Sequence, residues 1–310
     1  MTELSPALAT LVARAEVLID RIEAALPAPV PATDWSAFAF RWRVRAGRGW
    51  LEAVKHPHKI SLDDLQGVDD QKVAVEQNTR QFVAGRPANN VLLTGARGTG
   101  KSSLVKAVLN RFARRGLRLI EVDKNDLIHL PDIVDLVSER REKFIIFCDD
   151  LSFESGEPGY KAMKSILDGS ISGIPENLLV YATSNRRHLM PEKMSENLET
   201  TFTNSHTTPH AGDSEIHPGE TTEEKISLSD RFGVWLSFYP FDQDHYLAVC
   251  AHWLASYGLP PMEQIAGARA EALLWALTRG SRSGRVAWQF ARDYAGRKVS
   301  RRARPAKARL

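Results

Sequence analysis

The sequence has only two cysteines, Cys148 and Cys250, and their positions give neither a disulfide framework nor the spacing of a zinc site. No apolar run approaches the roughly 20 residues that a membrane-spanning helix needs. Glu3 stands where an export signal would carry positive charge, and Arg14 and Asp20 interrupt the apolar stretch that follows. We therefore expect a reduced, cytoplasmic protein without a membrane segment.

Acidic residues are also missing from the C-terminal end. Residues 297–310, "RKVSRRARPAKARL", carry seven Lys/Arg and no acid. The whole chain has a net charge of +3, so residues 1–296 carry about −4 (3 − 7 = −4). A basic tail at 298–310 on a mildly acidic body is suited to nucleic acid or another polyanion. The plainer alternative is a solvated chain end.

The first 60 residues read as a helical and extended N-terminal region. Apolar residues at helical spacing predict an amphipathic helix over residues 5–26, which "PAPVP" ends. In "AFRWRVR", residues 39–45, apolar and aromatic side chains alternate with arginines. Period-two alternation predicts a half-exposed strand with its aromatics packed inward and its arginines solvated. The same interleaving also suits binding of single-stranded nucleic acid.

The segment 61–240 alternates strands with helices, which predicts an α/β core with a parallel sheet flanked by helices. The candidate strands are "NVLLTG", "RLIEVD", "KFIIFCDD", "LLVYATSN" and "VWLSFYP". Residues 190–226 hold eight acids, two lysines and few large apolar side chains, so they predict a mobile insertion whose three histidines lack metal-ligand spacing. Helical patterns over 241–297 predict a small C-terminal lid.

A phosphate-binding loop is the most specific motif. "GARGTGKS" matches G-x-x-x-x-G-K-[ST] in full, between a predicted strand and a predicted helix. Its glycines allow a tight turn of backbone N–H groups, the helix N-terminus favours an anion, and Lys101 reaches the β- and γ-phosphates. The residues predicted to bind the nucleotide here are Gly95, Ala96, Arg97, Gly98, Thr99, Gly100, Lys101, Ser102 and Ser103.

Two adjacent acids end the apolar strand "KFIIFC". In P-loop proteins such a strand supplies the carboxylate of the Mg²⁺ site, so we expect Asp149 to hold the metal together with the Ser102 hydroxyl. Asp150 follows where ATPases usually carry a Glu that polarises the attacking water. We expect Asp150 to take that role. Its side chain is one methylene shorter, so it would act through an adjusted backbone or support slow hydrolysis. The alternatives are Glu154 as the base, or an Asp150 that only hydrogen-bonds locally.

Three further segments resemble motifs of AAA+ ATPases. "SLDDLQGVDDQ" lies upstream of the P-loop, where the resemblance gives Leu65, Gly67 and Val68 the adenine contact. "YATSN" ends a later strand, and its Asn185 matches the polar residue called sensor 1. "SLSDRFG" resembles box VII of clamp loaders and replication initiators, which makes Arg231 the candidate arginine finger for a neighbouring subunit. A surface ion pair is the alternative for Arg231.

The segment "GSRSGRVAWQF" resembles the sensor 2 opening of the last lid helix. The resemblance leaves two candidates for the phosphate contact, Arg282 and Arg285. A cap by Ser283 would put Arg285 in the first turn of the helix, facing the phosphates, and therefore favours Arg285.

Within AAA+ proteins, the chain most resembles the bacterial family called domain of unknown function 815. "LDDLQGVDDQK", "DDLSFE", "YATSNRRHL" and "SLSDRFG" carry this resemblance over roughly residues 35 to 297. It implies an ATPase using ATP and Mg²⁺, assembled as a ring or partial ring, that acts on a protein or nucleic-acid target. A nucleotide-gated adaptor resembling a helicase loader is the alternative. A P-loop kinase of a small molecule is less favoured, because the sensor motifs and the arginine-finger motif occur together in this chain.

Overall fold

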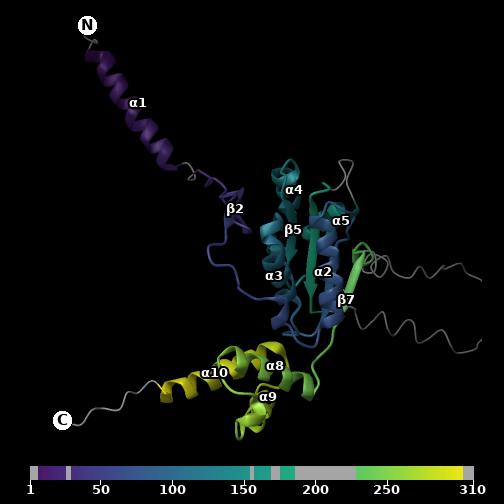
Figure 1. Cartoon of the computed structure of the whole chain (residues 1–310). Coiled ribbons are helices and arrows are strands. Elements are labelled where there is room, and N and C mark those ends of the chain that lie inside the picture. The colour runs from purple at the N-terminus through teal and green to yellow at the C-terminus, as the bar shows by residue number, and fades with distance from the viewer. Residues whose placement is uncertain (1–5, 26–28, 154–156, 169–174, 186–227, 303–310) are drawn as a thin grey trace, which may run out of the picture.

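The computed structural model describes residues 6–25, 29–153, 157–168, 175–185 and 228–302 (Figure 1). Glu154 and the predicted insertion at 190–226 lie outside the described residues. The described part folds into a three-layer α/β core and a separate layer of helices that lies across one end of the sheet.

A seven-stranded sheet forms the centre of the core, in the order β2-β1-β4-β5-β6-β3-β7. Six of its strands run parallel, and β2 pairs antiparallel with β1 at one edge. The five predicted strands are confirmed. The strands are β1 Ala39–Arg45, β2 Arg48–Ala53, β3 Val91–Gly95, β4 Leu117–Glu121, β5 Lys143–Cys148, β6 Leu178–Ser184 and β7 Val234–Phe238.

Helices cover both faces of the sheet, which explains why the central strands are apolar runs without alternation. The alternating side chains of β5 point to opposite faces of the sheet. Ile145 and Phe147 pack on the face covered by α2 and α3. Phe144 and Ile146 pack on the face covered by α4 and α5. The helices are α2 Asp69–Val83, α3 Lys101–Phe112, α4 Leu130–Ser138 and α5 Pro158–Asp168, with 3₁₀ turns at η1 Leu62–Asp64, η2 Ala113–Arg115 and η3 Lys124–His129.

The predicted C-terminal lid is a small helical unit with an apolar core of its own (Figure 1). Tyr246 and Phe290 are fully buried at its centre, where α8 packs against α10. Because β3 and β5 end at this side of the sheet, the lid faces the carboxyl ends of the parallel strands. The lid consists of α8 Gln243–Ser256, η5 Met262–Gln264, α9 Ala268–Thr278 and α10 Gly284–Arg302.

The β1–β2 hairpin extends the sheet beyond β4. Its predicted alternation is confirmed, since Phe40 and Trp42 are buried while Arg41 and Arg43 stay exposed. Arg41 pairs with Glu121 on β4 at 2.7 Å, and Arg43 pairs with the cross-strand residue Glu52 at 2.8 Å. This part of the N-terminal region therefore belongs structurally to the sheet.

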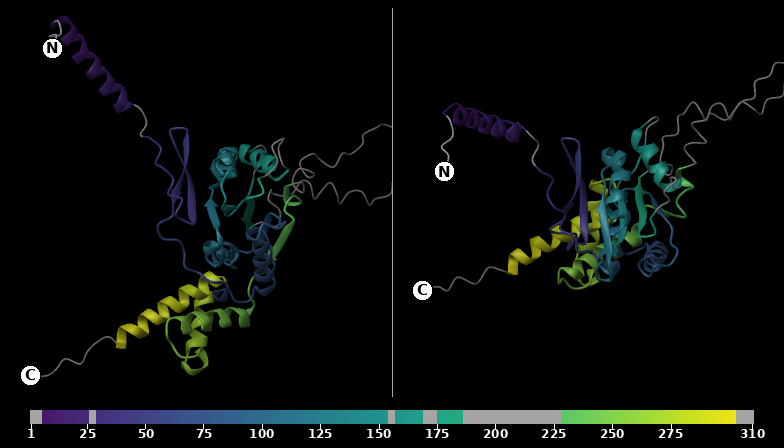
Figure 2. Two further views of the ribbon diagram at one scale, coloured as in Figure 1. Left: turned by 45° about the horizontal axis from the view of Figure 1, so that its top comes forward. Right: turned by 90° about the horizontal axis from the view of Figure 1, so that it is seen from above.

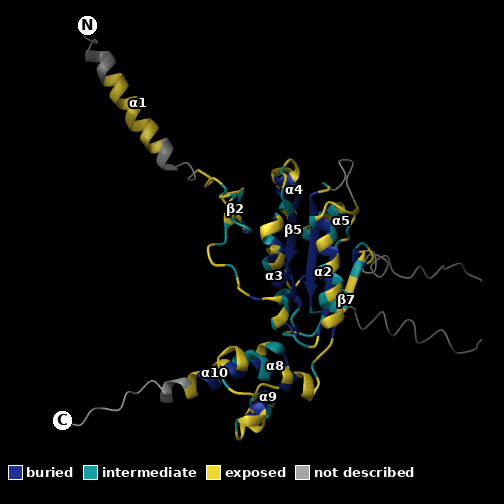
Figure 3. Cartoon of the chain, viewed as in Figure 1, coloured by how far each residue is buried: buried dark blue, intermediate teal, exposed yellow. Residues whose placement is uncertain are grey.

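Helix α1, Pro6–Ala25, confirms the helix predicted at 5–26. It stands away from the body in all the views of Figures 1 and 2, and its residues 10–21 are all exposed (Figure 3). Leu11 and Leu18 are 64% and 59% exposed, so the apolar face of this helix is unburied in the single chain. Across the described ranges, no helix combines the length and the apolar content needed to cross a bilayer.

Candidate functional site

The turn from β3 into α3 leaves no room for side chains at its first glycine. Gly95 has φ of 127°, and a Cβ there would lie 1.9 Å from the backbone oxygen of Phe238 on β7. Gly100 has φ of 108° immediately before α3 begins. Both angles lie in the region that only glycine adopts readily. The glycines of the P-loop motif thus let the turn pass close to β7 and enter the helix.

Lys101 is buried at the start of α3, with 5% of its surface exposed. Its Nζ donates to the carbonyl oxygens of Gly95 and Ala96, both at 2.7 Å, and to Oδ1 of Asn185 at 3.1 Å. Burial lowers the pKa of Lys101 below its ordinary value, while the nearby Asp149 partly opposes that shift. Among the described residues, no carboxylate is within ion-pair distance of this ammonium group.

Asp149 is joined to both neighbouring elements by short hydrogen bonds. Ser102 Oγ donates to its Oδ1 at 2.6 Å, and Thr183 Oγ1 donates to the same oxygen at 2.5 Å. The pair predicted to hold a metal therefore does lie together. No sequence pattern signals Thr183, because its position beside Asp149 depends on the register that pairs Cys148 with Ala182.

Asp150 has a left-handed backbone, with φ of 55°. Its N–H donates to Thr183 Oγ1 at 2.9 Å, and its carboxylate accepts a hydrogen bond from the side-chain amide of Asn185. The guanidinium of Arg97 lies 3.9 Å from the same carboxylate. Asp and Asn are the non-glycine residues that tolerate this conformation best. The turn after β5 thus directs Asp150 toward the P-loop and the end of β6.

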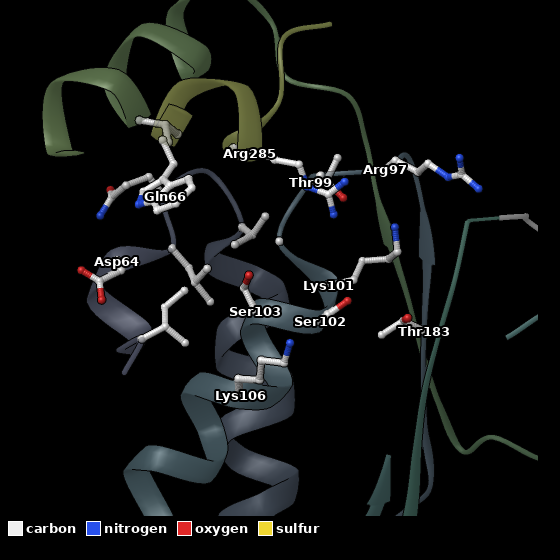
Figure 4. A pocket seen from close by; sticks show the side chains of 18 of the residues that line it. Asp64, Gln66, Arg97, Thr99, Lys101, Ser102, Ser103, Lys106, Thr183 and Arg285 are labelled. Atoms are coloured by element: carbon white, nitrogen blue, oxygen red, sulfur yellow. The ribbon is translucent and has the colours of Figure 1, made fainter. Parts of the chain in front are cut away.

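A cavity of about 630 Å³ lies between the core and the lid (Figure 4). Figure 4 shows Lys101, Ser102 and Thr183 grouped on one wall, with Arg285 entering from the lid. Most of the predicted site residues line this one cavity: Leu65, Val68, Arg97, Gly98, Thr99, Gly100, Lys101, Ser102, Ser103, Asp149, Asp150, Asn185 and Arg285.

Five predicted residues do not line the cavity, and four of them are close in sequence to residues that do. Gly95 and Ala96 contribute backbone oxygens to Lys101, as described above. Gly67, with φ of 74°, instead lies against the lid, where a Cβ would be 3.1 Å from His245. Arg282 precedes the lid's last helix and is absent from the cavity wall, whereas Arg285 is part of it.

Arg231 lies away from the cavity of its own chain. Its guanidinium forms an ion pair with Asp168, at the C-terminal end of α5. The structure thus shows Arg231 in the ion pair that was the alternative to a finger role. A contribution to the cavity would have to be made to another copy of the chain.

The last lid helix begins against the P-loop. Ser283 Oγ accepts from the N–H of Val286 at 3.3 Å, so the predicted helix cap is confirmed. The N–H of Arg285 donates to the carbonyl oxygen of Gly98 at 3.4 Å. These contacts connect the lid directly to the turn that surrounds Lys101.

Two tryptophans of the lid, Trp253 on α8 and Trp288 on α10, also line the cavity. Neither is predicted from the sequence. Trp288 follows Arg285 by three residues, and this helical spacing places them on one face. No comparable sequence spacing indicates that Trp253 would line the cavity. Beside it, His252 Nε2 lies 3.2 Å from Asp64 Oδ1, which joins the lid to η1 across the cavity wall.

The strand order, the turn between β3 and α3 and the helical lid together define the AAA+ class of P-loop ATPase folds. Within this class, the chain belongs to the family described as "Protein of unknown function (DUF815)", whose model matches residues 35–298. Both the class and the family resemblance drawn from the sequence are therefore confirmed.

Individual relatives are more distant. Proteasome-activating nucleotidase 2 of Haloferax volcanii is 32% identical over 126 residues, which cover 33% of this chain and only 28% of that protein. The Thermotoga maritima RuvB Holliday junction branch migration motor has a TM-score of 0.50 and 16% identity, covering 78% of this chain and 66% of its own. A single-site variant of the same RuvB gives a TM-score of 0.51 at 14% identity, with the same coverage of both chains. The solved structures show a shared fold.

The left-handed backbone of Asp150 generates a stability prediction. Asp150→Val should lower the free energy of unfolding by about 1–2 kcal/mol, because a β-branched residue is strained at this φ. Asp150→Asn should change it by less than about 0.5 kcal/mol, since Asn adopts the same conformation. Urea unfolding followed by circular dichroism measures both. Equal losses for the two variants would show that the backbone angle is not the cause.

Proposed function

We propose that the protein binds ATP with Mg²⁺ in the cavity between core and lid and hydrolyses it as a homo-oligomer. Hydrolysis would change the angle between core and lid and so drive a conformational change in a protein or nucleic-acid target in the cytoplasm. The family and fold support the class of function. The chemistry of the cavity supports the reaction.

The observation that carries the proposal is the buried ammonium group of Lys101, which has hydrogen-bond acceptors but no ion-pair partner among the described residues. A buried ammonium group surrounded by carbonyls and an amide is costly unless an anion completes its surroundings. The N-terminus of α3 and the N–H groups of the turn add positive potential at the same point. Arg97 and Arg285 line the same wall. A polyphosphate is the ligand that satisfies this arrangement.

The donor set beside Lys101 fits Mg²⁺. Asp149 and Ser102 offer a carboxylate and a hydroxyl oxygen within 2.6 Å of each other, and Mg²⁺ commonly takes one or two protein oxygens together with phosphates and water. The ion would supply charge neutralisation between the β- and γ-phosphates. Thr183 would hold the Asp149 carboxylate in place through its 2.5 Å hydrogen bond.

Asp150 is the residue proposed to accept a proton from the attacking water. Its carboxylate stands at the open side of the site, between Asn185 and Arg97. Asn185 donates to Asp150 and accepts from Lys101, so one amide orients both groups. Leu65 and Val68 belong to the apolar part of the wall and are proposed to contact adenine.

A helicase-loader-like adaptor with little turnover is the second candidate. The same geometry favours it, because the short side chain of Asp150 is held by Asn185 and lies near Arg97 in the single chain. A carboxylate held by these contacts is less available to an attacking water. In that case, ATP occupancy would set the lid angle, and hydrolysis would be incidental.

Lys101→Ala should abolish ATP binding, because it removes the side-chain charge aimed at the β- and γ-phosphates. Isothermal titration with MgATP measures the loss. Lys161→Ala is the matched control, since Lys161 is an exposed lysine on α5. Wild-type affinity in the Lys101 variant would place the nucleotide elsewhere.

Asp150→Asn should keep ATP affinity and lose turnover, because the amide has the shape of the acid but cannot take up a proton from water. Phosphate release under saturating ATP reports turnover, and titration reports binding in the same preparation. If Asp150→Asn released phosphate at the wild-type rate, Asp150 would not be the base. Glu154→Gln would then be the next variant to assay. A wild type that binds ATP but releases no phosphate would favour the adaptor.

Arg231→Ala should bind ATP normally and hydrolyse it poorly if the arginine completes a neighbour's site. Comparable arginines contribute about 10³–10⁵ in rate. Mixing this variant with Lys101→Ala should restore activity, because some interfaces then combine an intact P-loop with an intact arginine. The recovered activity should rise with protein concentration.

Two outcomes would contradict the role in trans. One is an inactive mixture in which native mass spectrometry detects mixed oligomers. The other is a monomeric wild type with full activity. In either case, the role of Arg231 would be structural, through its ion pair with Asp168.

A further inference from the structure

One stretch at the edge of the sheet is strongly basic, although the body of the chain is acidic overall. Residues 41–59 contain six Lys/Arg and one acid, a net charge of +5. Since residues 1–296 together carry about −4, the remainder of that body carries about −9 (−4 − 5 = −9). The stretch comprises the β1–β2 hairpin and the connector that follows it. A basic element on an acidic body is the electrostatic footprint of a polyanion partner.

The hairpin projects past the sheet. Arg41 is level with Glu121, the last residue of β4, so the four following residues of β1 extend about 13 Å beyond that strand. The tip is Arg45-Ala46-Gly47-Arg48, in which Ala46 and Gly47 have φ of 49° and 72°. Positive φ at both central residues gives a tight turn that keeps the two flanking arginines opposite each other. Figure 2 shows this ribbon at the margin of the core.

The pleat separates the two faces of the hairpin. Phe40, Trp42 and Leu51 lie on one face, which packs into the core. The cross-strand pairs Arg43–Trp50 and Arg45–Arg48 lie on the other face, which looks away from it. Trp50 is half-buried there, so an aromatic ring and arginines share one solvent-facing surface.

The arginines of this face fall into two groups. Arg41 and Arg43 are neutralised by Glu121 and Glu52. Arg45 and Arg48 are both exposed, and neither has an ion pair or a side-chain hydrogen bond with any residue in the described part of the chain. Like charges at directly opposed positions of two paired strands, without a counter-charge, destabilise the pair. An anionic ligand would relieve that repulsion.

We propose that the outward face of the β1–β2 hairpin binds single-stranded nucleic acid, with Arg45 and Arg48 contacting phosphates and Trp50 stacking on a base. Cationic side chains and an aromatic ring on one face are the combination that such binding uses. An acidic polypeptide would use the charges but not the ring. The tip residues Ala46 and Gly47 offer no large apolar group to insert into a lipid surface.

The test measures binding of a fluorescently labelled 20-nucleotide oligothymidylate to the full chain without nucleotide, across a series of salt concentrations. Removing two phosphate contacts with Arg45→Ala/Arg48→Ala should lower the affinity and reduce the logarithmic salt slope by about 1.4, at about 0.7 per single-strand contact. Trp50→Leu should weaken binding about fivefold or more without changing the slope, because stacking releases no counterions.

The matched control is Arg86→Ala/Arg269→Ala, which removes the same charge from two exposed sites outside the hairpin. It should retain wild-type affinity and slope. The proposal is overturned if the hairpin variant binds like this control, or if the wild type does not bind the oligonucleotide at 50 mM salt. It is also overturned if removing residues 298–310 abolishes all binding, or if polyglutamate competes as well as unlabelled oligothymidylate. Because ATP is absent, these outcomes do not depend on the ATPase proposal.

Discussion

The buried charge of Lys101 is the constraint on which the rest of the site depends. Its ammonium group needs three acceptors, and the structure supplies them from the turn after β3 and from the end of β6. That requirement fixes how close the turn comes to Asn185. Gly95 can then lie close beside Phe238 of β7 only because it lacks a Cβ. The cavity, the acids beside it and the lid contact at Gly98 all follow from the path of this one turn.

Sequence patterns were sufficient where structure is set locally. A full P-loop motif, five apolar strands and a serine cap each depend on neighbouring residues, and all appear in the fold. Contacts that depend on strand register could not be predicted from the sequence. Thr183 meets Asp149 only because β5 and β6 pair in one particular alignment. Trp253 reaches the cavity only because the lid packs over the core, and no local pattern encodes that placement.

The two proposed ligand surfaces both follow the carboxyl ends of parallel strands in one sheet. The P-loop follows β3, and the tip of the β1–β2 hairpin follows β1. Strands β4, β5 and β6 separate them. These strands are buried on both faces, so they form a rigid spacer between the two surfaces. The lid would then move, and the hairpin would stay fixed, relative to the same rigid sheet.

The backbone at Asp150 also bears on how this position can change over evolutionary time. Asp and Glu codons differ by one nucleotide, and the exchange is usually regarded as mild. Here the longer acid would lose the local tolerance that Asp has for positive φ, and its carboxylate would move past Asn185. A drift toward the Glu common in other ATPases would therefore cost stability at the turn after β5. The paired aspartates are held by the geometry of that turn, so they can persist without any selection for speed of hydrolysis.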